Sequence, residues 1–491
     1  MTEADILDAI ETFQRYGVPQ EQIFNEVMRA RYLDYVLFLN PTNVQYGISI
    51  DDLYENMKRT ADKLGLYEGD ADTYAKVYTL ALRVEPMAFA PDVPPAGEEI
   101  HSLLRAAVKT AADSGNTILL AGADAYLPFL DEAFKELGGK RIAVAVKDPA
   151  WKERLQLVFP RGRAMVMDEL AADTEKYDYI FDAAHSLSSA CRLRHVLAEK
   201  GAMDLLIPYE ELVNGAEEAE TARKELSLSQ QLASYYDTEI QGKEYAFLRF
   251  GGEPSAVITF GESGYEEGVF TGYDRLQIPM SAFIEANDWN YDLYAYNGEP
   301  AIQMLLSGNV VQPEHTIGEA FQVAVPKTMP AGIYPRLSAE SLEESGVRLD
   351  TIESAKWEAA EAHTVAQAGD VVLTVKERKV YAAVVPEGVE AITQVGVLVL
   401  RPCGMYSGEY LKLYLDGPVG QLFLGTMKAG ETYHMTASRL LRIPLPQANA
   451  EKIEMISRLC RQTTEALARA EAAWRKAKRD SVALMMGHEK Q

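Results

Sequence analysis

The sequence predicts an α/β protein with a helical N-terminal region, a doubly wound parallel sheet, a mixed α/β domain and a long C-terminal helix. Three observations predict it. Apolar residues recur at three- and four-residue spacing through residues 1–90, as in amphipathic helices. Short apolar runs alternate with amphipathic stretches between residues 97 and 262, which is typical of βα units. Residues 448–485 contain no proline or glycine that would end a helix.

Composition limits the class of protein. With 491 residues, 47% of them hydrophobic and 25% charged, the chain has the composition of a soluble protein of several domains. It has no long apolar run and no basic-then-apolar start, so we expect a cytoplasmic protein without a membrane contact. Cys191, Cys403 and Cys460 are too widely spaced for a disulfide framework or a metal site, and we expect no metal.

The net charge of −25 argues against broad contact with nucleic acid, because phosphate binding needs clustered lysine and arginine. The charge is uneven, however. Residues 1–339 hold 29 basic and 53 acidic residues, whereas residues 340–491 hold 19 and 20. Only the last third is therefore close enough to neutral to meet DNA without help.

The elements of residues 1–262 follow in order. Three amphipathic stretches fill residues 1–90, and prolines in "FAPDVPPAGEE" (89–99) end helical structure. A helix then leads to the strand "TILLAG", and further helices separate "RIAVAV", "AMVMDEL" and "YDYIFDA". "SACRLRHVLAEKG" (189–201) predicts a helix before the strand "AMDLLIP". The runs "YAFLRFGG" and "SAVITFGE" predict an adjacent antiparallel pair that closes the sheet.

The rest of the chain divides into three parts. Residues 263–314 are rich in glycine, asparagine and tyrosine and read as a connector, and residues 315–447 read as a mixed α/β domain. Residues 448–485 read as one helix with a three-four pattern that suits either a dimer seam or packing on its own domain. The residues of this pattern are Ile453, Ile456, Cys460, Thr463, Leu467, Ala470 and Trp474.

Residues 366–446 resemble the target-recognition domain of type I restriction specificity subunits. The resemblance rests on the "GDVV" strand, the "VVPEG" turn, the strand ending in "LRP", the helix "EYLKLYLDGPVG", the "AGETYHM" patch and "LLRIPLPQ" before the helical spacer. It implies double-stranded DNA as partner, together with restriction-modification subunits. A single such domain with one spacer helix suggests a homodimer that presents two half-sites.

Residues 97–262 are similar, element for element, to the Rossmann-like adenine-specific methyltransferase partner of those subunits. In that family a glycine-rich turn after the first strand admits S-adenosylmethionine. Here Gly122 remains, with Asp124 nearby, but Tyr126, Leu127 and Pro128 follow. The acid expected after the second strand falls on Val146, whereas Asp168 after the third strand is retained and would face an adenine ring.

The family's Asn-Pro-Pro-aromatic signature falls on Ala183, Ala184, His185 and Ser186. Alanine offers no side-chain acceptor for the adenine amino group and serine cannot stack on a flipped base. The sequence therefore predicts an emptied catalytic site and no bound cofactor; S-adenosylmethionine would be the cofactor if the site were functional. A replacement role for His185 as a base, oriented by Asp182, is the weaker interpretation.

Two short stretches are candidates for DNA contact. "TVKERKV" places Lys376, Arg378 and Lys379 at a hairpin, where they suit either DNA or a solvated tip. The resemblance also points to Thr432, Tyr433 and His434. The leading hypothesis is a DNA-recognition protein of restriction-modification or phage-defence type without methyl transfer. The alternatives are an acidic regulatory protein that binds restriction-modification components, and an active adenine methyltransferase.

Overall fold

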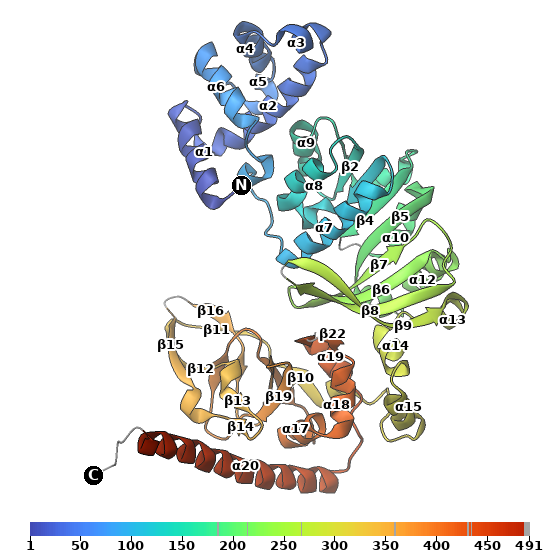
Figure 1. Cartoon of the computed structure of the whole chain (residues 1–491), viewed down its shortest axis with the longest axis vertical. Helices are drawn as coiled ribbons and strands as arrows, with labels where there is room; N and C mark the ends of the chain where they lie inside the picture. The colour runs from blue at the N-terminus through green and yellow to red at the C-terminus, as the bar shows by residue number, and fades with distance from the viewer. Residues whose placement is uncertain are drawn as a thin grey trace. The chain divides into compact units, whose positions relative to one another are not determined.

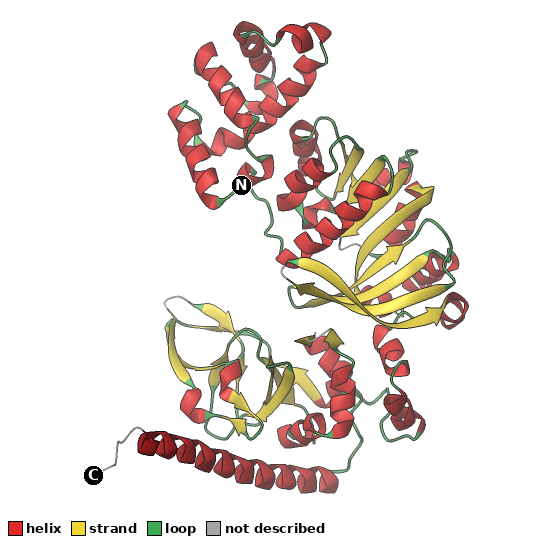
Figure 2. Ribbon diagram, in the orientation of Figure 1, coloured by secondary structure: helices red, strands yellow, loops and turns green. Residues whose placement is uncertain are grey.

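The computed structural model describes residues 1–183, 186–213, 215–266, 268–357, 360–429, 432–433 and 435–485. The chain forms two compact units, Met1–Asn290 and Tyr291–Gln491 (Figure 1). The first contains the N-terminal helices and a large sheet, and the second contains smaller sheets and the long C-terminal helix (Figure 2). The predicted α/β class with these parts is confirmed.

The N-terminal helices pack around their own apolar core. Thr2 caps the first helix through a reciprocal capping box with Asp5, which satisfies backbone N–H groups that the helix cannot. Phe13, Val27 and Val77, from three different helices, are fully buried in this core. The helices are α1 (Glu3–Arg15), α2 (Ile23–Phe38), α3 (Pro41–Tyr46), α4 (Ile50–Arg59), α5 (Ala61–Leu64) and α6 (Ala71–Ala81).

A nine-stranded sheet follows, in the order β3-β2-β1-β4-β5-β7-β6-β8-β9. Strands β1 to β5 are parallel, and β7 lies antiparallel between β5 and β6. The strands are β1 (Thr117–Ala121), β2 (Arg141–Val146), β3 (Arg163–Val166), β4 (Tyr177–Ala183), β5 (Leu197–Pro208), β6 (Leu232–Ile240), β7 (Lys243–Phe250), β8 (Val257–Glu266) and β9 (Val269–Pro279). The helices are α7 (Glu98–Asp113), α8 (Leu130–Glu136), α9 (Pro149–Val158), α10 (Leu187–Val196), α11 (Tyr209–Val213), α12 (Glu217–Leu228) and α13 (Met280–Ala286).

The far side of this sheet differs from the sequence prediction. The two runs expected to pair directly are β7 and β8, and the unpredicted strand β6 lies between them. A two-residue turn joins β6 to β7, with Gln241 and Gly242 both at positive φ, 51° and 76°. Residues 263–266 and 269–279 of the expected connector continue the sheet in β8 and β9. The predicted helix 189–201 ends at Val196, because pairing with Tyr177 draws Leu197 into β5.

The second unit contains two four-stranded sheets, β10-β21-β18-β19 and β15-β12-β20-β17. Their strands are β10 (Phe321–Val323), β21 (Leu398–Pro402), β18 (Val371–Lys376), β19 (Lys379–Val384), β15 (Glu353–Trp357), β12 (Gly332–Leu337), β20 (Ala391–Thr393) and β17 (Val365–Ala366). Shorter pairs are β11 (Lys327–Met329) with β16 (Glu361–His363), β13 (Leu342–Glu343) with β14 (Gly346–Val347), and β22 (Lys428–Ala429) with β23 (Thr432–Tyr433). The helices are α14 (Tyr291–Asn297), α15 (Pro300–Ser307), α16 (Ile317–Ala320), α17 (Gly408–Asp416), α18 (Pro418–Gly425), α19 (Ala437–Arg442) and α20 (Ala450–Met485).

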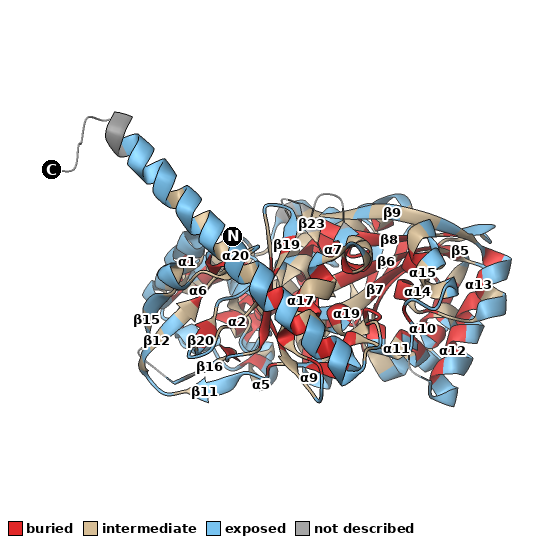
Figure 3. Cartoon of the chain, turned by 90° about the horizontal axis from the view of Figure 1, so that it is seen from below, coloured by how far each residue is buried: buried red, intermediate tan, exposed pale blue. Residues whose placement is uncertain are grey.

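The predicted seam residues lie along helix α20, and the two halves of the helix differ in how far they are buried. Ile453 and Cys460 are buried, and the first half packs against α17, where the hydroxyls of Ser407 and Ser457 lie 2.6 Å apart. Beyond Cys460 most of the helix is exposed, and Trp474 keeps 63% of its surface accessible (Figure 3). The first residues of the seam pattern are therefore packed within the domain, and its last residue, Trp474, is exposed.

Candidate functional site

The carboxyl ends of β1, β2 and β4 meet at one edge of the sheet, because β1 pairs in parallel with both neighbours. In open α/β sheets ligands bind at this edge. Gly122 and Asp124 follow β1, Asp168 follows β3, and Ser186 follows β4. Ala184 and His185 lie outside the described residues, so the structure gives the surroundings of Ala183 and Ser186 alone.

The turn after β1 is filled by an aromatic side chain. Gly122 adopts a left-handed conformation, φ 62° and ψ 30°, and opens a short 3₁₀ turn over Ala123–Ala125. The Tyr126 side chain is fully buried, its hydroxyl donates a hydrogen bond to the Ala121 carbonyl at 2.7 Å, and its ring lies 5.4 Å from that of Phe181. Burial, with Asp182 and Asp124 nearby, raises the pKa of Tyr126 well above its usual value, so the phenol stays a donor.

Asp124 has a local structural role. Its carboxylate accepts a hydrogen bond from the backbone N–H of Lys147 at 2.7 Å, and this joins the turn after β1 to the end of β2. Val146, where the resemblance implies a ribose-binding acid, is buried and apolar. Asp148 instead caps α9 by accepting from the Ala150 N–H at 2.8 Å. The Asp124 carboxylate thus connects the turn after β1 with the end of β2.

The remaining predicted positions at this edge offer little to a ligand. Asp168 is exposed on a 3₁₀ helix, Met167–Ala172, and makes no hydrogen bond or ion pair within the described residues. Ala183 is buried, and Ser186 precedes α10, where its hydroxyl lies 2.9 Å from that of Ser188. Asp182, beside them, is almost completely buried. Of the acids at this edge, Asp124 is thus engaged with a backbone N–H, Asp182 is buried and Asp168 is exposed.

The predicted basic hairpin lies at the β18–β19 turn, where Glu377 and Arg378 both have positive φ, 52° and 61°. Lys376 donates to the Leu342 carbonyl at 2.9 Å, and Lys379 forms an ion pair with Glu344. Both ammonium groups also lie over the ring of Tyr381, 4.9 Å and 5.5 Å from its centroid. Lys376 and Lys379 are therefore engaged within the domain. Arg378 is exposed at the tip.

The short strands β22 and β23, at the "AGETYHM" patch, pair antiparallel. Thr432 pairs with Ala429 and Tyr433 with Lys428 through the backbone. Tyr433 is half-buried against the apolar core of this unit, as expected of a scaffold residue. His434 lies outside the described residues.

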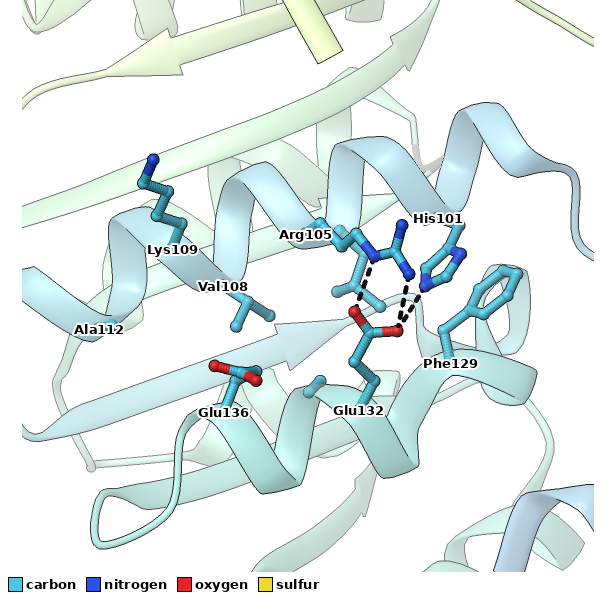
Figure 4. A pocket seen from close by; sticks show the side chains of 10 residues that line it. His101, Arg105, Val108, Lys109, Ala112, Phe129, Glu132 and Glu136 are labelled. Atoms are coloured by element: carbon cyan, nitrogen blue, oxygen red, sulfur yellow. Dashed lines mark hydrogen bonds and ion pairs between the residues drawn. The ribbon is translucent and has the colours of Figure 1, made fainter. Parts of the chain in front are cut away.

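A cavity that sequence reasoning missed lies between α7 and α8 (Figure 4). Its volume is about 310 Å³, and Leu104, Val108 and Ala133 are among the apolar side chains that line it. Glu132 accepts from His101 and from Arg105, each at 2.7 Å. The faces of two helices form this cavity, so the signal in the sequence was limited to His101 and Arg105, one turn apart in the helix predicted before the strand "TILLAG". Within the described part of the chain no cluster of three metal-binding side chains occurs, and no described helix is long and apolar enough to span a membrane.

Comparison with known proteins gives structural likenesses at low identity. No protein-family model matches the sequence, and no curated protein matches it. The type IIG restriction endonuclease BpuSI is 9% identical, with a TM-score of 0.38 over 93% of this chain and 74% of that one. A chain from a type I restriction-modification system is 12% identical, with a TM-score of 0.34 over 60% of this chain and 83% of that one. A TehB-like S-adenosylmethionine-dependent methyltransferase from Corynebacterium glutamicum is 16% identical, with a TM-score of 0.24 over 36% of this chain and 99% of that one. Identities and TM-scores this low carry no conclusion about activity.

Proposed function

We propose that the chain is a DNA-recognition protein of restriction-modification or phage-defence type whose methyltransferase-like domain does not transfer methyl groups. One observation carries the negative part: the buried Tyr126 side chain, bonded to the Ala121 carbonyl, fills the turn after β1. S-adenosylmethionine would need open space at that turn and an acid after β2. The residues present, Tyr126 and Val146, do not fit that group.

Methyl transfer is tested with purified protein, radiolabelled S-adenosylmethionine and genomic DNA that lacks adenine methylation. We expect no incorporation above a no-enzyme control, and calorimetry with the same donor should give no binding heat. If S-adenosylmethionine bound without methyl incorporation, the loss of methyl transfer would stand, but the proposal that Tyr126 fills the cofactor pocket would be contradicted. Incorporation would establish the alternative, an active adenine methyltransferase.

DNA recognition is assigned to residues 315–447, the domain that resembles a specificity subunit. Its support is the near balance of 19 basic and 20 acidic residues in residues 340–491, against the acidic remainder of the chain. Arg378, at the β18–β19 tip, is the first residue to test, followed by Thr432, Tyr433 and His434. A genuine DNA complex should weaken steeply as salt rises, because phosphate contacts release counterions.

The alternative is an acidic regulatory protein that binds restriction-modification subunits in place of DNA. The internal contacts of Lys376 and Lys379 favour it, because cations already engaged in the domain are less available to phosphate. Duplex binding at low salt separates the two functions. A regulator should bind no duplex there, whereas the recognition protein should bind and lose affinity when Arg378 is replaced by glutamine.

A further inference from the structure

We propose that a second cavity of the first unit, between α7 and the β8–β9 hairpin, binds a phosphate-bearing ligand. The cavity has a volume of about 420 Å³. Its described lining includes no acidic side chain. The polar side chains that line it are Ser102, Arg105, Lys109, Thr110, Tyr236 and Arg249. This inference is independent of the proposed DNA recognition, which rests on the second unit.

The charge of this lining departs from its surroundings. Residues 1–339 hold 53 acidic and 29 basic residues, whereas the described lining of this cavity has three cationic side chains and no carboxylate. The carboxylates that pair with Arg105 and Arg249 do not line this cavity. Glu132, which lines the neighbouring cavity, accepts a hydrogen bond of 2.7 Å from Arg105. Asp204, within the sheet, accepts a hydrogen bond from Arg249. Asp274, which accepts from the Tyr236 hydroxyl at 2.8 Å, does not line the cavity.

Arg249 is positioned in advance for an anion. Its Nε and Nη2 donate to the two oxygens of Asp204, at 3.0 Å and 2.9 Å, and Asp204 also accepts from the Tyr179 hydroxyl at 2.8 Å. Asp204 is 1% exposed, whereas the Arg249 side chain is 37% exposed. A guanidinium fixed on one edge retains donors for a phosphate and loses less entropy when it binds one.

Lys109 supplies a cation that also borders the first cavity, and no described carboxylate pairs with it. It is exposed on α7 and makes no hydrogen bond or ion pair with any described residue. Its ammonium group points away from Glu132 and Glu136 (Figure 4). Val269 and Phe270 add an apolar wall to the cavity. A phosphate between Lys109 and Arg249, with its organic part against Phe270, fits this combination, as in a nucleotide or another phosphate ester.

Calorimetry on the full chain tests the site, with inorganic pyrophosphate and AMP as probes. Wild-type protein should bind pyrophosphate, and Lys109→Gln should weaken binding by about tenfold through loss of one charge-assisted hydrogen bond. Lys135→Gln, which removes an exposed lysine of α8 outside the lining, is the matched control and should bind as the wild type does. The double variant Asp204→Asn/Arg249→Gln removes the fixed guanidinium without leaving a lone buried charge, and it should abolish binding.

A competing duplex oligonucleotide identifies the source of the phosphate. Displacement of pyrophosphate by duplex assigns the cavity to a nucleic-acid phosphate, and binding that duplex leaves unchanged assigns it to a free phosphate ester. Absence of heat with both probes at millimolar concentration would overturn the proposal, as would wild-type affinity in Lys109→Gln. If the double variant loses its native circular dichroism, it is not folded, and the affinity of Lys109→Gln for pyrophosphate decides whether the proposal stands. Loss of this site would leave DNA binding by the second unit unchanged.

Discussion

The guanidinium of Arg249 and the carboxylate of Asp204 face each other on adjacent strands, β7 and β5, joined by two hydrogen bonds of 3.0 Å and 2.9 Å. The carboxylate is buried near the centre of the nine-stranded sheet and also accepts from the Tyr179 hydroxyl. The effect on stability of replacing one partner should depend on whether the other is present, because an unpaired charge buried in that position lowers the free energy of unfolding.

We therefore predict that Arg249→Gln lowers the free energy of unfolding by about 3 kcal/mol, since it leaves the buried Asp204 carboxylate without its counterion. The double variant Asp204→Asn/Arg249→Gln should recover most of that loss. Urea unfolding of the wild type, both single variants and the double variant measures the coupling. Lys58→Gln, which breaks the exposed Lys58–Glu55 pair, is the control and should leave the urea midpoint almost unchanged. Additive single effects would contradict the coupling.

Tyr126 should contribute through both its hydroxyl and its ring. Tyr126→Phe removes the hydrogen bond to the Ala121 carbonyl and should cost about 1 kcal/mol, whereas Tyr126→Ala also leaves a cavity and should cost roughly 3–5 kcal/mol. Chemical denaturation measures both changes. Tyr245→Phe removes the hydroxyl of a half-buried tyrosine for which the described residues supply no hydrogen bond, and it should change stability by less than about 0.5 kcal/mol. Equal small effects of all three substitutions would show that the turn after β1 is not tightly packed.

Asp131 should make stability depend on pH. Its carboxylate accepts from the Met87 N–H at 2.8 Å, and burial raises its pKa to about 7. Below pH 4 the folded and unfolded forms are both protonated. Between about pH 4 and 7 the unfolded form has released the proton that the folded form retains, so this contribution to stability falls as pH rises. The melting temperature of Asp131→Asn should therefore fall less than that of wild type between pH 5 and 8. The exposed Asp113→Asn should follow the wild-type profile, and an Asp131→Asn profile parallel to it would contradict the assignment.

The exposed half of α20 is the proposed homodimer seam. Leu467 and Trp474 are 38% and 63% exposed, and they continue the apolar pattern beyond the buried Cys460. We expect light scattering to give twice the chain mass of 54.4 kDa, and Leu467→Glu/Trp474→Glu to give the chain mass itself. Ala472→Glu places the same charge on the opposite side of the helix and should leave the dimer intact. A wild-type monomer at high concentration would exclude the dimer.

The apolar runs of the sequence determined the strands of the parallel half-sheet, because periodicity and chain breakers are local properties. They also determined that bulky residues follow Gly122 and that Ala183 stands at the start of the signature. The structure explains what those residues do: Tyr126 fills the turn, and Asp124 joins two strand ends. Sequence reasoning placed Asp124 near a cofactor, because no local pattern reveals that its partner is the Lys147 amide.

Tertiary structure alone decided the far half of the sheet and the pairing of its charges. Strand β6 lies between two strands that the sequence suggested were neighbours, although the Gln241-Gly242 turn was a readable signal for the β6–β7 hairpin. Lys376 and Lys379 read as free cations until the fold brought Leu342 and Glu344 to them. Arg249 and Asp204 meet only because β7 inserts beside β5. The order of strands and the partners of charges depend on contacts between residues distant in sequence, and those contacts are fixed by packing of the whole sheet.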